Sequence, residues 1–354
     1  MPIHLEEYNY FLPNERIAQA PAFPRDSAGL FVYNTQTDTV DFDIFRNIDQ
    51  YLPHNSHLVM NDTEVVPARV FLRSETGMTH ELLLMMNDVR PTSRTIPAMA
   101  REKIAVGATL YFQSGAFFTV QENHEKYFQL LPNIPIPEIF TLLRSEGTTP
   151  IPPYITDSPL DEQALRKDYQ SILAKYPASV AAPTASLHFT PEVFSRLTNI
   201  GIQKSTITLH IGAGTFAPLT DENFSTKSLF PEYFCISETS SSAINKAIAE
   251  GFPIIPVGTT ATRSIESAAT LEQFGSWKIL PTAKETTLFL YPPYDFRVTN
   301  HLLTNFHVPC SSLLLLVDAF LQHRRAPRRI LDLYSLAIKE EFRFYSFGDA
   351  MLIL

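Results

Sequence analysis

The chain has 354 residues, 45% of them hydrophobic and 18% charged, which is enough length for two domains and enough apolar material for a substantial core. Its formal net charge of −9 argues against a surface coated in positive charge for nonspecific nucleic-acid binding, although it leaves room for a local basic patch. The two cysteines, Cys235 and Cys310, fit no zinc or redox spacing, and the longest apolar run (LLLLV, 313–317) is too short to span a membrane, so we expect a cytoplasmic protein.

The first 66 residues predict a helix that begins within 12–21 and strands at 29–35 and 57–62. The second strand leads into Asn61, Asp62 and Thr63. Polar side chains at the carboxyl end of a strand are a common location for sites in α/β proteins. The alternative interpretation of Asp62 is structural, as half of a buried pair with an arginine such as Arg69.

The next segment, residues 67–155, has a different character. Short alternating stretches separated by turn residues predict strands at 68–74, 80–86, 108–114, 116–122 and 126–132. Strands at this spacing are typical of a small all-β module, and we expect a barrel. The proline-rich stretch GTTPIPPYI (147–155) predicts a rigid connector that closes the module.

From residue 156 onward, helices and strands alternate again. The pattern predicts helices at 161–176, 237–251, 311–324 and 328–344, strands at 205–214 and 301–306, and a strand, turn and helix within 252–269. We therefore predict an α/β domain formed by 1–66 and 156–354, interrupted by a β-barrel domain at 67–155.

Two glycines follow the strand predicted at 205–214, in the stretch ITLHIGAGTFAPL. Gly212 and Gly214 could belong to a phosphate-binding loop or to a tight bend between strands. Ala217 stands where a third glycine is expected, and Pro218 opposes a helix that continues from the turn. The bend is therefore favoured.

One stretch and three histidines carry candidate chemistry. VGTTATRSIES (257–267) places Thr259, Thr260 and Arg263 at a helix start, which predicts an anion or carboxylate site; the alternative is an ordinary helix cap with a solvated arginine. His188, His210 and His307 each stand at a strand-to-loop junction. His307 is a candidate acid or base, and each histidine could instead be a hydrogen-bonded structural residue.

The motifs together identify a resemblance. The chain resembles the S-adenosylmethionine:tRNA ribosyltransferase-isomerase family of queuosine biosynthesis nearly from end to end. The resemblance rests on these stretches: YNYFLPNERIAQAPAFPRDSAGLFV, LVMNDTEVVPARV, PIPPYI, DYQSILAKYPASVAAPTASLHFT, TLHIGAGTFAPL, VGTTATRSIESA, LLTNFHVPCSSLLLLVDAF and FRFYSFGDAMLI. The family fold, an α/β domain with an inserted β-barrel, agrees with the boundaries predicted above.

The resemblance implies that S-adenosylmethionine serves as a ribosyl donor and co-substrate. The implied acceptor is 7-aminomethyl-7-deazaguanine at the wobble position of a tRNA, and the implied products are epoxyqueuosine in the tRNA, adenine and methionine. It implies no metal and no further cofactor, and we expect a monomer. The sulfonium acidifies the neighbouring C5′ hydrogens, so a positioned base could begin ring opening and loss of adenine.

From the matching motifs we assign site residues as hypotheses. The candidates for catalysis are His307, His188, Asp62 and Glu232. The candidates for binding S-adenosylmethionine are Gly212, Gly214, Thr215, Phe216, Thr259, Thr260, Arg263 and Asn305. Arg263 is the candidate partner of the methionine carboxylate, and the rings of Phe189, Phe216 and Phe306 are candidates for stabilising the sulfonium.

Several positions depart from the family pattern. Glu64, Gly29 and Cys310 replace two expected arginines and a lysine, Lys227 and Phe230 replace two expected histidines, and Ser186 replaces a glycine. Lost positive charge weakens contacts with phosphates. The alternative hypothesis is therefore a divergent paralogue that binds S-adenosylmethionine or a related nucleoside without modifying tRNA, or that acts on another acceptor.

Overall fold

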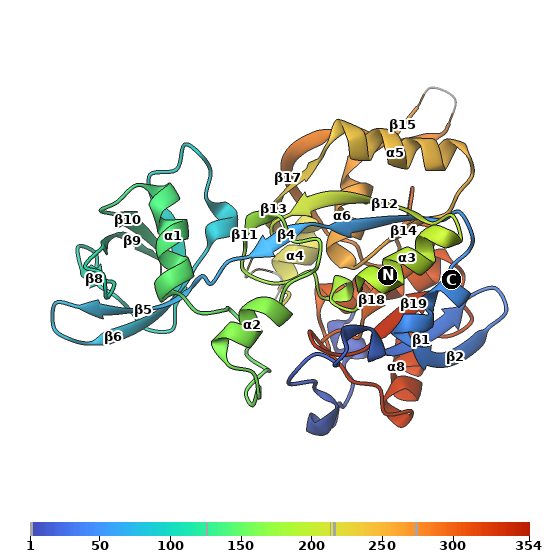
Figure 1. Ribbon diagram of the computed structural model, residues 1–354, viewed down its shortest axis with the longest axis horizontal. Helices are drawn as coiled ribbons and strands as arrows, with labels where there is room; N and C mark the ends of the chain where they lie inside the picture. The colour runs from blue at the N-terminus through green and yellow to red at the C-terminus, as the bar shows by residue number, and fades with distance from the viewer. Residues whose placement is uncertain (1–2, 125–126, 213, 215–216, 273–274) are drawn as a thin grey trace.

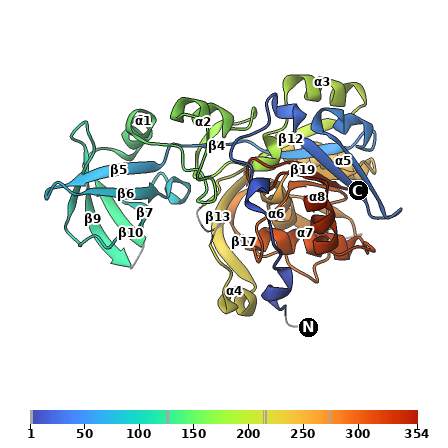
Figure 2. The ribbon, with the colours of Figure 1, turned by 90° about the horizontal axis from the view of Figure 1, so that it is seen from below.

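The computed structural model describes residues 3–124, 127–212, 214, 217–272 and 275–354. A large α/β lobe carries both termini, and a smaller barrel lobe projects from one side of it (Figure 1). Seen from below, the two lobes are joined by a narrow region near β4 and α2 (Figure 2).

The first sheet of the large lobe has five strands in the order β14, β3, β12, β13 and β17. Their bounds are Ile254–Pro256, His57–Asn61, Gln203–Leu209, Ser228–Ile236 and Thr282–Leu288. Strands β14, β3 and β12 are parallel, whereas β13 and β17 are antiparallel additions at one edge. Every residue of β3 is buried, as expected for a central parallel strand covered on both faces.

A second sheet of four strands has the order β18 (Leu302–Asn305), β19 (Ala350–Ile353), β1 (Gly29–Asn34) and β2 (Thr39–Ile44). Alternate side chains of β1 enter different cores: Leu30 faces a core shared with the first sheet, whereas Phe31 faces the helices that cover the opposite side. Because β1 pairs with β19, the two ends of the chain meet in one sheet.

Eight helices occur in the described ranges: α1 (Ile136–Glu146), α2 (Glu162–Asp168), α3 (Pro191–Asn199), α4 (Asp221–Thr226), α5 (Glu238–Ala249), α6 (Thr259–Ala268), α7 (Ser312–His323) and α8 (Ile330–Lys339). Helices α5 and α6 cover the first sheet, and α7 and α8 cover the second. The apolar run that was too short for a membrane lies in α7, where it is buried. No helix in these ranges has the length and apolarity needed to cross a bilayer.

The smaller lobe is a closed antiparallel barrel with strand order β10, β7, β6, β5, β8 and β9. The bounds are β5 Arg69–Ser74, β6 Thr79–Leu84, β7 Ile96–Ala100, β8 Thr109–Tyr111, β9 Phe117–His124 and β10 Tyr127–Pro132. The inward side chains form a separate apolar core, which α1 completes. Two short ribbons, β4 (Thr63–Val65) with β11 (Tyr176–Ser179) and β15 (Ala269–Leu271) with β16 (Trp277–Ile279), complete the strands.

Helix α2 and the residues after it hold the junction between the lobes. The side chain of Gln170 bonds both the amide and the carbonyl of Val65, at 3.0 and 2.7 Å. Glu162 accepts the backbone amide of Thr149 at 3.0 Å. These contacts connect α2 to both crossings of the chain between the lobes.

The α/β fold with an inserted β-barrel is confirmed, and all barrel strands fall inside 67–155, while the boundaries themselves stay a prediction. The helix predicted within 12–21 is wrong: the chain there makes one 3₁₀ turn, Asn14–Arg16, and then pairs with Phe344. The helix predicted at 161–176 ends at Asp168, where Tyr169 turns into the core. The sequence did not predict nine strands of the described residues: β2, β4, β7, β11, β13, β15, β16, β17 and β19. Two of them, β7 and β13, each contain a proline that obscures the strand pattern.

Candidate functional site

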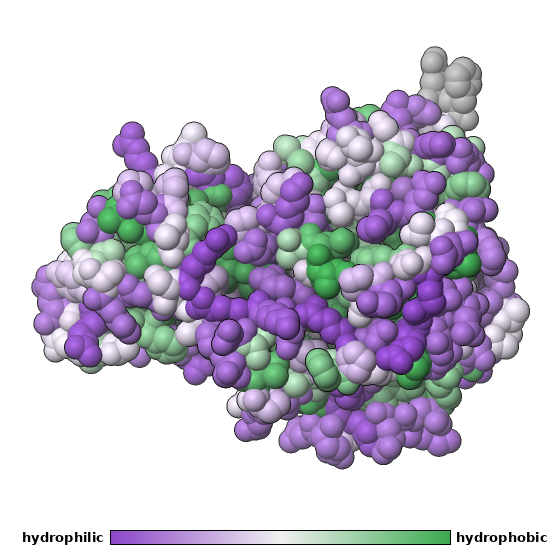
Figure 3. All heavy atoms as spheres, in the orientation of Figure 1, coloured by the Kyte–Doolittle hydropathy of each residue, from purple (hydrophilic) through white to green (hydrophobic). Residues whose placement is uncertain are grey.

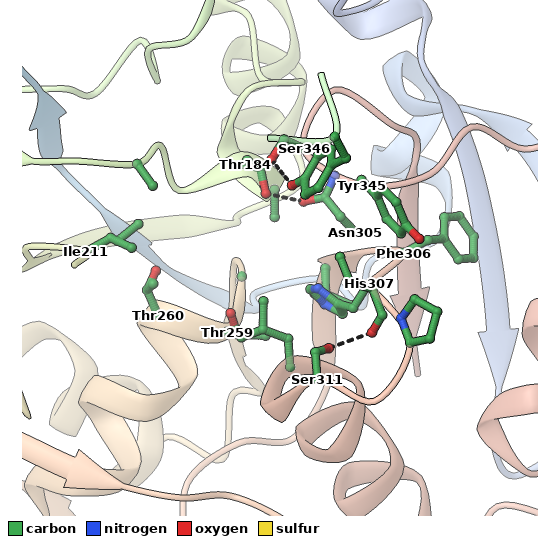
Figure 4. A pocket seen from close by; sticks show the side chains of 18 of the residues that line it. Thr184, Ile211, Thr259, Thr260, Asn305, Phe306, His307, Ser311, Tyr345 and Ser346 are labelled. Carbon is green, nitrogen blue, oxygen red and sulfur yellow. Dashed lines mark hydrogen bonds between the residues drawn. The ribbon is translucent and has the colours of Figure 1, made fainter. Parts of the chain in front are cut away.

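A cavity of about 420 Å³ opens at the carboxyl ends of β14 and β18 in the large lobe (Figure 4). Its walls come from five segments: Ala181–Ala185, Ile211 with Ala217–Leu219, Gly258–Thr260, Thr304–Ser311 and the pair Tyr345–Ser346; Leu5, Pro153, Tyr154 and Leu313 complete the lining. The described lining residues include no Asp, Glu, Lys or Arg. The volume falls in the range of small-molecule sites, about 300–1,000 Å³.

The N-terminus of α6 forms one side of this cavity. Gly258 precedes the helix with φ of 87°, a conformation that favours glycine, and no side chain caps the helix. The hydroxyl of Thr260 accepts from Asn61 Nδ2 at 3.2 Å. The hydroxyl of Thr259, a buried residue that lines the cavity, has no hydrogen-bond partner among the described residues. The first amides of α6 thus remain available to a ligand.

Helix α7 also begins at the cavity. Ser311 is its N-cap: its Oγ accepts from Leu314 N at 3.2 Å and donates to Val308 O at 2.6 Å. The amino ends of α6 and α7 therefore lie at the same cavity, on the side where Thr259 and Ser311 are drawn in Figure 4. Because each helix N-terminus carries partial positive charge, this side of the cavity favours an anion.

His307 lines the cavity and is held from three directions. Its Nε2 lies 2.7 Å from Thr304 Oγ1, its backbone amide donates to Tyr334 Oη at 2.8 Å, and its carbonyl accepts from the Tyr10 hydroxyl. Burial lowers the pKa of His307 to about 3. The ring is therefore neutral near pH 7 and has an unprotonated nitrogen that can accept a proton, although a pKa this far below the working pH makes it a weak base.

Asn305 reaches the cavity from the end of β18 with its amide held in place. Its Oδ1 accepts from Thr184 Oγ1 at 2.8 Å, and its Nδ2 donates to Asp349 O at 3.3 Å. His188 lies behind it, with Nε2 3.4 Å from Asn305 Nδ2, and does not line the cavity. Burial lowers the pKa of His188 to about 4, so the ring is neutral near pH 7, and its link to the cavity is the contact with Asn305.

Arg263 and Glu232 form a buried ion pair outside the large cavity. Arg263 Nε also donates to Leu288 O at 3.0 Å, and Glu232 accepts the amide of Gly212 at 3.2 Å. The pair therefore braces the chain where it leaves β12. Arg263, predicted from sequence to receive the methionine carboxylate, instead faces a second cavity of about 20 Å³.

The glycine stretch has no described contact with the large cavity. Gly212 lies against Asn87 of the barrel lobe, and a Cβ added at Gly214 would come within 2.8 Å of the Phe230 side chain. Close packing thus requires glycine at 214, whereas at 212 the neighbouring atom is the terminal amide nitrogen of Asn87, which can shift. The next α-helix in the described residues, α4, begins at Asp221. Ile211 on one side and Ala217 on the other do line the cavity.

Asp62 lies at the end of β3 and is buried, away from the lining. Its Oδ1 accepts from Thr208 Oγ1 at 2.6 Å, and burial raises the pKa of its carboxyl. His210 is nearby in the sheet, with Nδ1 2.8 Å from Thr63 Oγ1. The suggested pairing of Asp62 with Arg69 does not occur, because Arg69 pairs with Glu81 at 3.3 Å.

The candidates from sequence therefore divide into four groups. Thr259, Thr260, Asn305 and His307 line the cavity. His188 supports it from behind, and Asp62, Glu232, Arg263, Gly212 and Gly214 lie outside its lining. Thr215 and Phe216 lie outside the described residues.

Sequence reasoning missed two aromatic residues of the lining, Tyr154 and Tyr345. Both stand in motifs that carried the resemblance, PIPPYI and FRFYSFGDAMLI, so motif position was a usable signal. Of the rings proposed instead, Phe189 is fully buried in the core between the sheets, and Phe306 has a face covered by Phe344 at 4.6 Å.

The positions that depart from the family pattern have clear structural settings. Glu64 forms an ion pair with Arg144 of α1 at 3.8 Å, and this pair connects the two lobes. Gly29 donates its amide to Asp349, and a Cβ there would meet Phe342 at 2.9 Å. Cys310 lines the cavity, so the lysine expected there is absent from the site itself.

The remaining departures lie outside the lining. Lys227 is exposed and ends α4 with φ of 54°, a left-handed conformation. Phe230 is half exposed, and its ring covers Gly214. Ser186 is fully buried.

The free energy of unfolding should fall as the pH is lowered from about 6.5 to about 4. The pKa of His57, His188, His210 and His301 is lowered to about 4, and that of His307 to about 3, in each case mainly by burial. In this window the unfolded chain binds protons that the folded chain does not, at about 1.4 kcal/mol per pH unit for each fully affected histidine. Urea unfolding at pH 7.5, 6 and 5 measures the effect.

Two carboxyl groups oppose this trend. The pKa of Asp62 is raised and that of Asp88 is raised to about 6, both mainly by burial, so the folded chain binds these protons more readily. Because the histidines outnumber these two carboxyl groups, the free energy of unfolding still falls as the pH is lowered. In a His57→Gln variant, stability should depend less steeply on pH. A urea midpoint that rose as the pH was lowered to 5 would contradict the predicted net loss of stability.

Comparison with known proteins gives a consistent result. A family model described as queuosine biosynthesis protein matches residues 5–353. A protein from Fusobacterium nucleatum named S-adenosylmethionine:tRNA ribosyltransferase-isomerase is 38% identical, covering 100% of this chain and 97% of that protein. A protein of the same name from Carboxydothermus hydrogenoformans is 37% identical, and the alignment covers 99% of this chain and 99% of that protein.

A solved structure is also similar to this fold. The crystal structure of S-adenosylmethionine tRNA ribosyltransferase from Thermotoga maritima aligns with a TM-score of 0.53 and 28% identity. The alignment covers 98% of this chain and 100% of that chain.

Proposed function

We propose how the cavity works in this chain, which belongs to the queuosine biosynthesis protein family. The chain transfers and isomerises the ribosyl moiety of S-adenosylmethionine onto tRNA. The finer assignment, taken from the family resemblance, is that the acceptor is 7-aminomethyl-7-deazaguanine at the wobble position and the product is epoxyqueuosine. The observation that supports these roles is the 420 Å³ cavity, where two helix N-termini and a neutral histidine meet.

The methionine carboxylate binds at the N-terminus of α6. The free Thr259 hydroxyl and the uncapped first amides of the helix provide donors, and the N-terminus of α7 adds favourable potential. This replaces the earlier candidate, Arg263, which is already paired with Glu232. Charge-assisted bonds from several amides can hold a carboxylate without a cationic side chain.

His307 is the base that removes a C5′ proton from S-adenosylmethionine. In the tautomer in which Nε2–H donates to Thr304 Oγ1, the unprotonated nitrogen is Nδ1, and this nitrogen has no partner among the described residues. Asn305 is fixed by Thr184 and backed by His188, and the second lone pair of its Oδ1 can accept from a donor of the bound nucleoside. Both side chains point to the cavity in Figure 4.

Product analysis tests this function. The purified protein, incubated with S-adenosylmethionine and tRNA that carries 7-aminomethyl-7-deazaguanine, should form epoxyqueuosine with one adenine released per modified tRNA. Nucleosides are measured by mass spectrometry after digestion of the tRNA. Saturable binding of S-adenosylmethionine without any modified nucleoside would instead support the divergent paralogue, a hypothesis that the full-length similarity to enzymes of this name disfavours.

A further inference from the structure

S-Adenosylmethionine brings a permanent positive charge into a cavity that offers it no counter-ion. The sulfonium cannot lose its charge by titration, and the described lining has no Asp or Glu. The helix N-termini, which favour the carboxylate, repel a cation. With no carboxylate in the described lining, the groups that can stabilise the sulfonium are neutral oxygen acceptors and the negative faces of aromatic rings.

Two tyrosine rings in the lining are suited to this role. The centroids of the Tyr154 and Tyr345 rings lie 4.8 Å apart with planes inclined at 55°, so together they form an angled aromatic surface. Tyr154 Oη lies 2.7 Å from Ser346 Oγ, which fixes the ring against the chain that carries Tyr345. Tyr154 stands in the proline-rich connector after the barrel, and its carbonyl accepts from Gln19 at 3.2 Å.

The rings and the helix N-termini lie on different sides of the cavity. Figure 4 shows Tyr345 and Ser346 across the opening from Thr259 and Ser311. A methionine whose carboxylate binds at Thr259 therefore extends its sulfur toward the tyrosines. The separation places each charge of the ligand beside the part of the wall with the opposite potential.

We propose that Tyr154, together with Tyr345, recognises the sulfonium and sets the preference for S-adenosylmethionine over neutral thioethers. The inference rests on the proposed function, because it takes S-adenosylmethionine as the ligand of this cavity. When the bond between sulfur and C5′ breaks, its electron pair remains on sulfur and the methionine becomes a neutral thioether. The attraction to the rings then disappears, which favours release of methionine after the reaction.

Calorimetric titration of the full chain with S-adenosylmethionine and with S-adenosylhomocysteine tests the proposal. The two ligands share the adenosyl and amino-acid groups but differ in the charge on sulfur. We expect the wild type to bind S-adenosylmethionine at least tenfold more tightly, and Tyr154→Leu to lose about tenfold for this ligand, or about 1.4 kcal/mol, while its affinity for S-adenosylhomocysteine changes less than about twofold. Tyr154→Phe, which keeps the ring, should retain the preference.

Tyr111→Leu, a change on the distant barrel, is the matched control and should leave both affinities unaltered. An equal loss for both ligands in Tyr154→Leu would overturn the proposal, because the ring would then only shape the cavity. The proposal would also be overturned if the wild type bound S-adenosylmethionine and S-adenosylhomocysteine equally well. That result does not depend on whether any variant folds. Failure of the wild type to bind S-adenosylmethionine at all would instead reject the proposed function.

Discussion

His307→Ala should lower the rate of adenine release by about 10²- to 10⁴-fold, the contribution expected of a positioned general base. The substitution should leave the fold intact, because Tyr334 and Tyr10 bond the backbone of this residue and not its ring. Affinity for S-adenosylmethionine should change only a few-fold, since the ring acts on a proton in the transition state. Single-turnover kinetics with saturating tRNA measure the chemical step.

A matched control is available at the opposite end of β18. His301 lies just before the other end of β18 and is outside the lining, so His301→Ala should keep the wild-type rate. Thr304→Val removes the hydroxyl that orients Nε2 and should cause a smaller loss than His307→Ala. A full rate in His307→Ala would exclude His307 as the base.

Arg263→Met should destabilise the fold by about 3–5 kcal/mol. Glu232 would keep its charge in a buried place after losing the guanidinium of Arg263, and removing one side of a buried ion pair carries this cost. The double variant Glu232→Gln with Arg263→Met should recover much of the loss, because no uncompensated charge remains. Urea unfolding of the two variants and the wild type, at constant pH, provides the comparison.

The same variant distinguishes the two roles considered for Arg263. If the guanidinium only braces Glu232 and the bend at Gly212, the folded variant should bind S-adenosylmethionine within a few-fold of the wild type. A rise in Kd of more than about tenfold, with folding verified under the assay conditions, would support a direct contact with the ligand carboxylate.

The sequence was most informative where a structure depends on neighbouring residues. Ser237 and Ser311 cap α5 and α7, and Gly251 adopts φ of 71° after α5, as local patterns predict. Alternation of apolar residues predicted most of the barrel, whose strands pair mainly with close neighbours in sequence. The helix prediction for 12–21 failed because Ile17 in this segment pairs with Phe344, which is more than three hundred residues away.

By itself, the sequence determined the α/β class with an inserted barrel and the family, and it predicted as site residues Thr259, Thr260, Asn305 and His307, which line the cavity. Only the tertiary structure decided how the candidates divide. It paired Arg263 with Glu232, placed His188 behind Asn305, and brought Tyr154 from the connector next to Tyr345. Periodicity and capping arise from neighbours along the chain, whereas a buried charge or an aromatic wall depends on contacts between distant segments, which no local pattern contains.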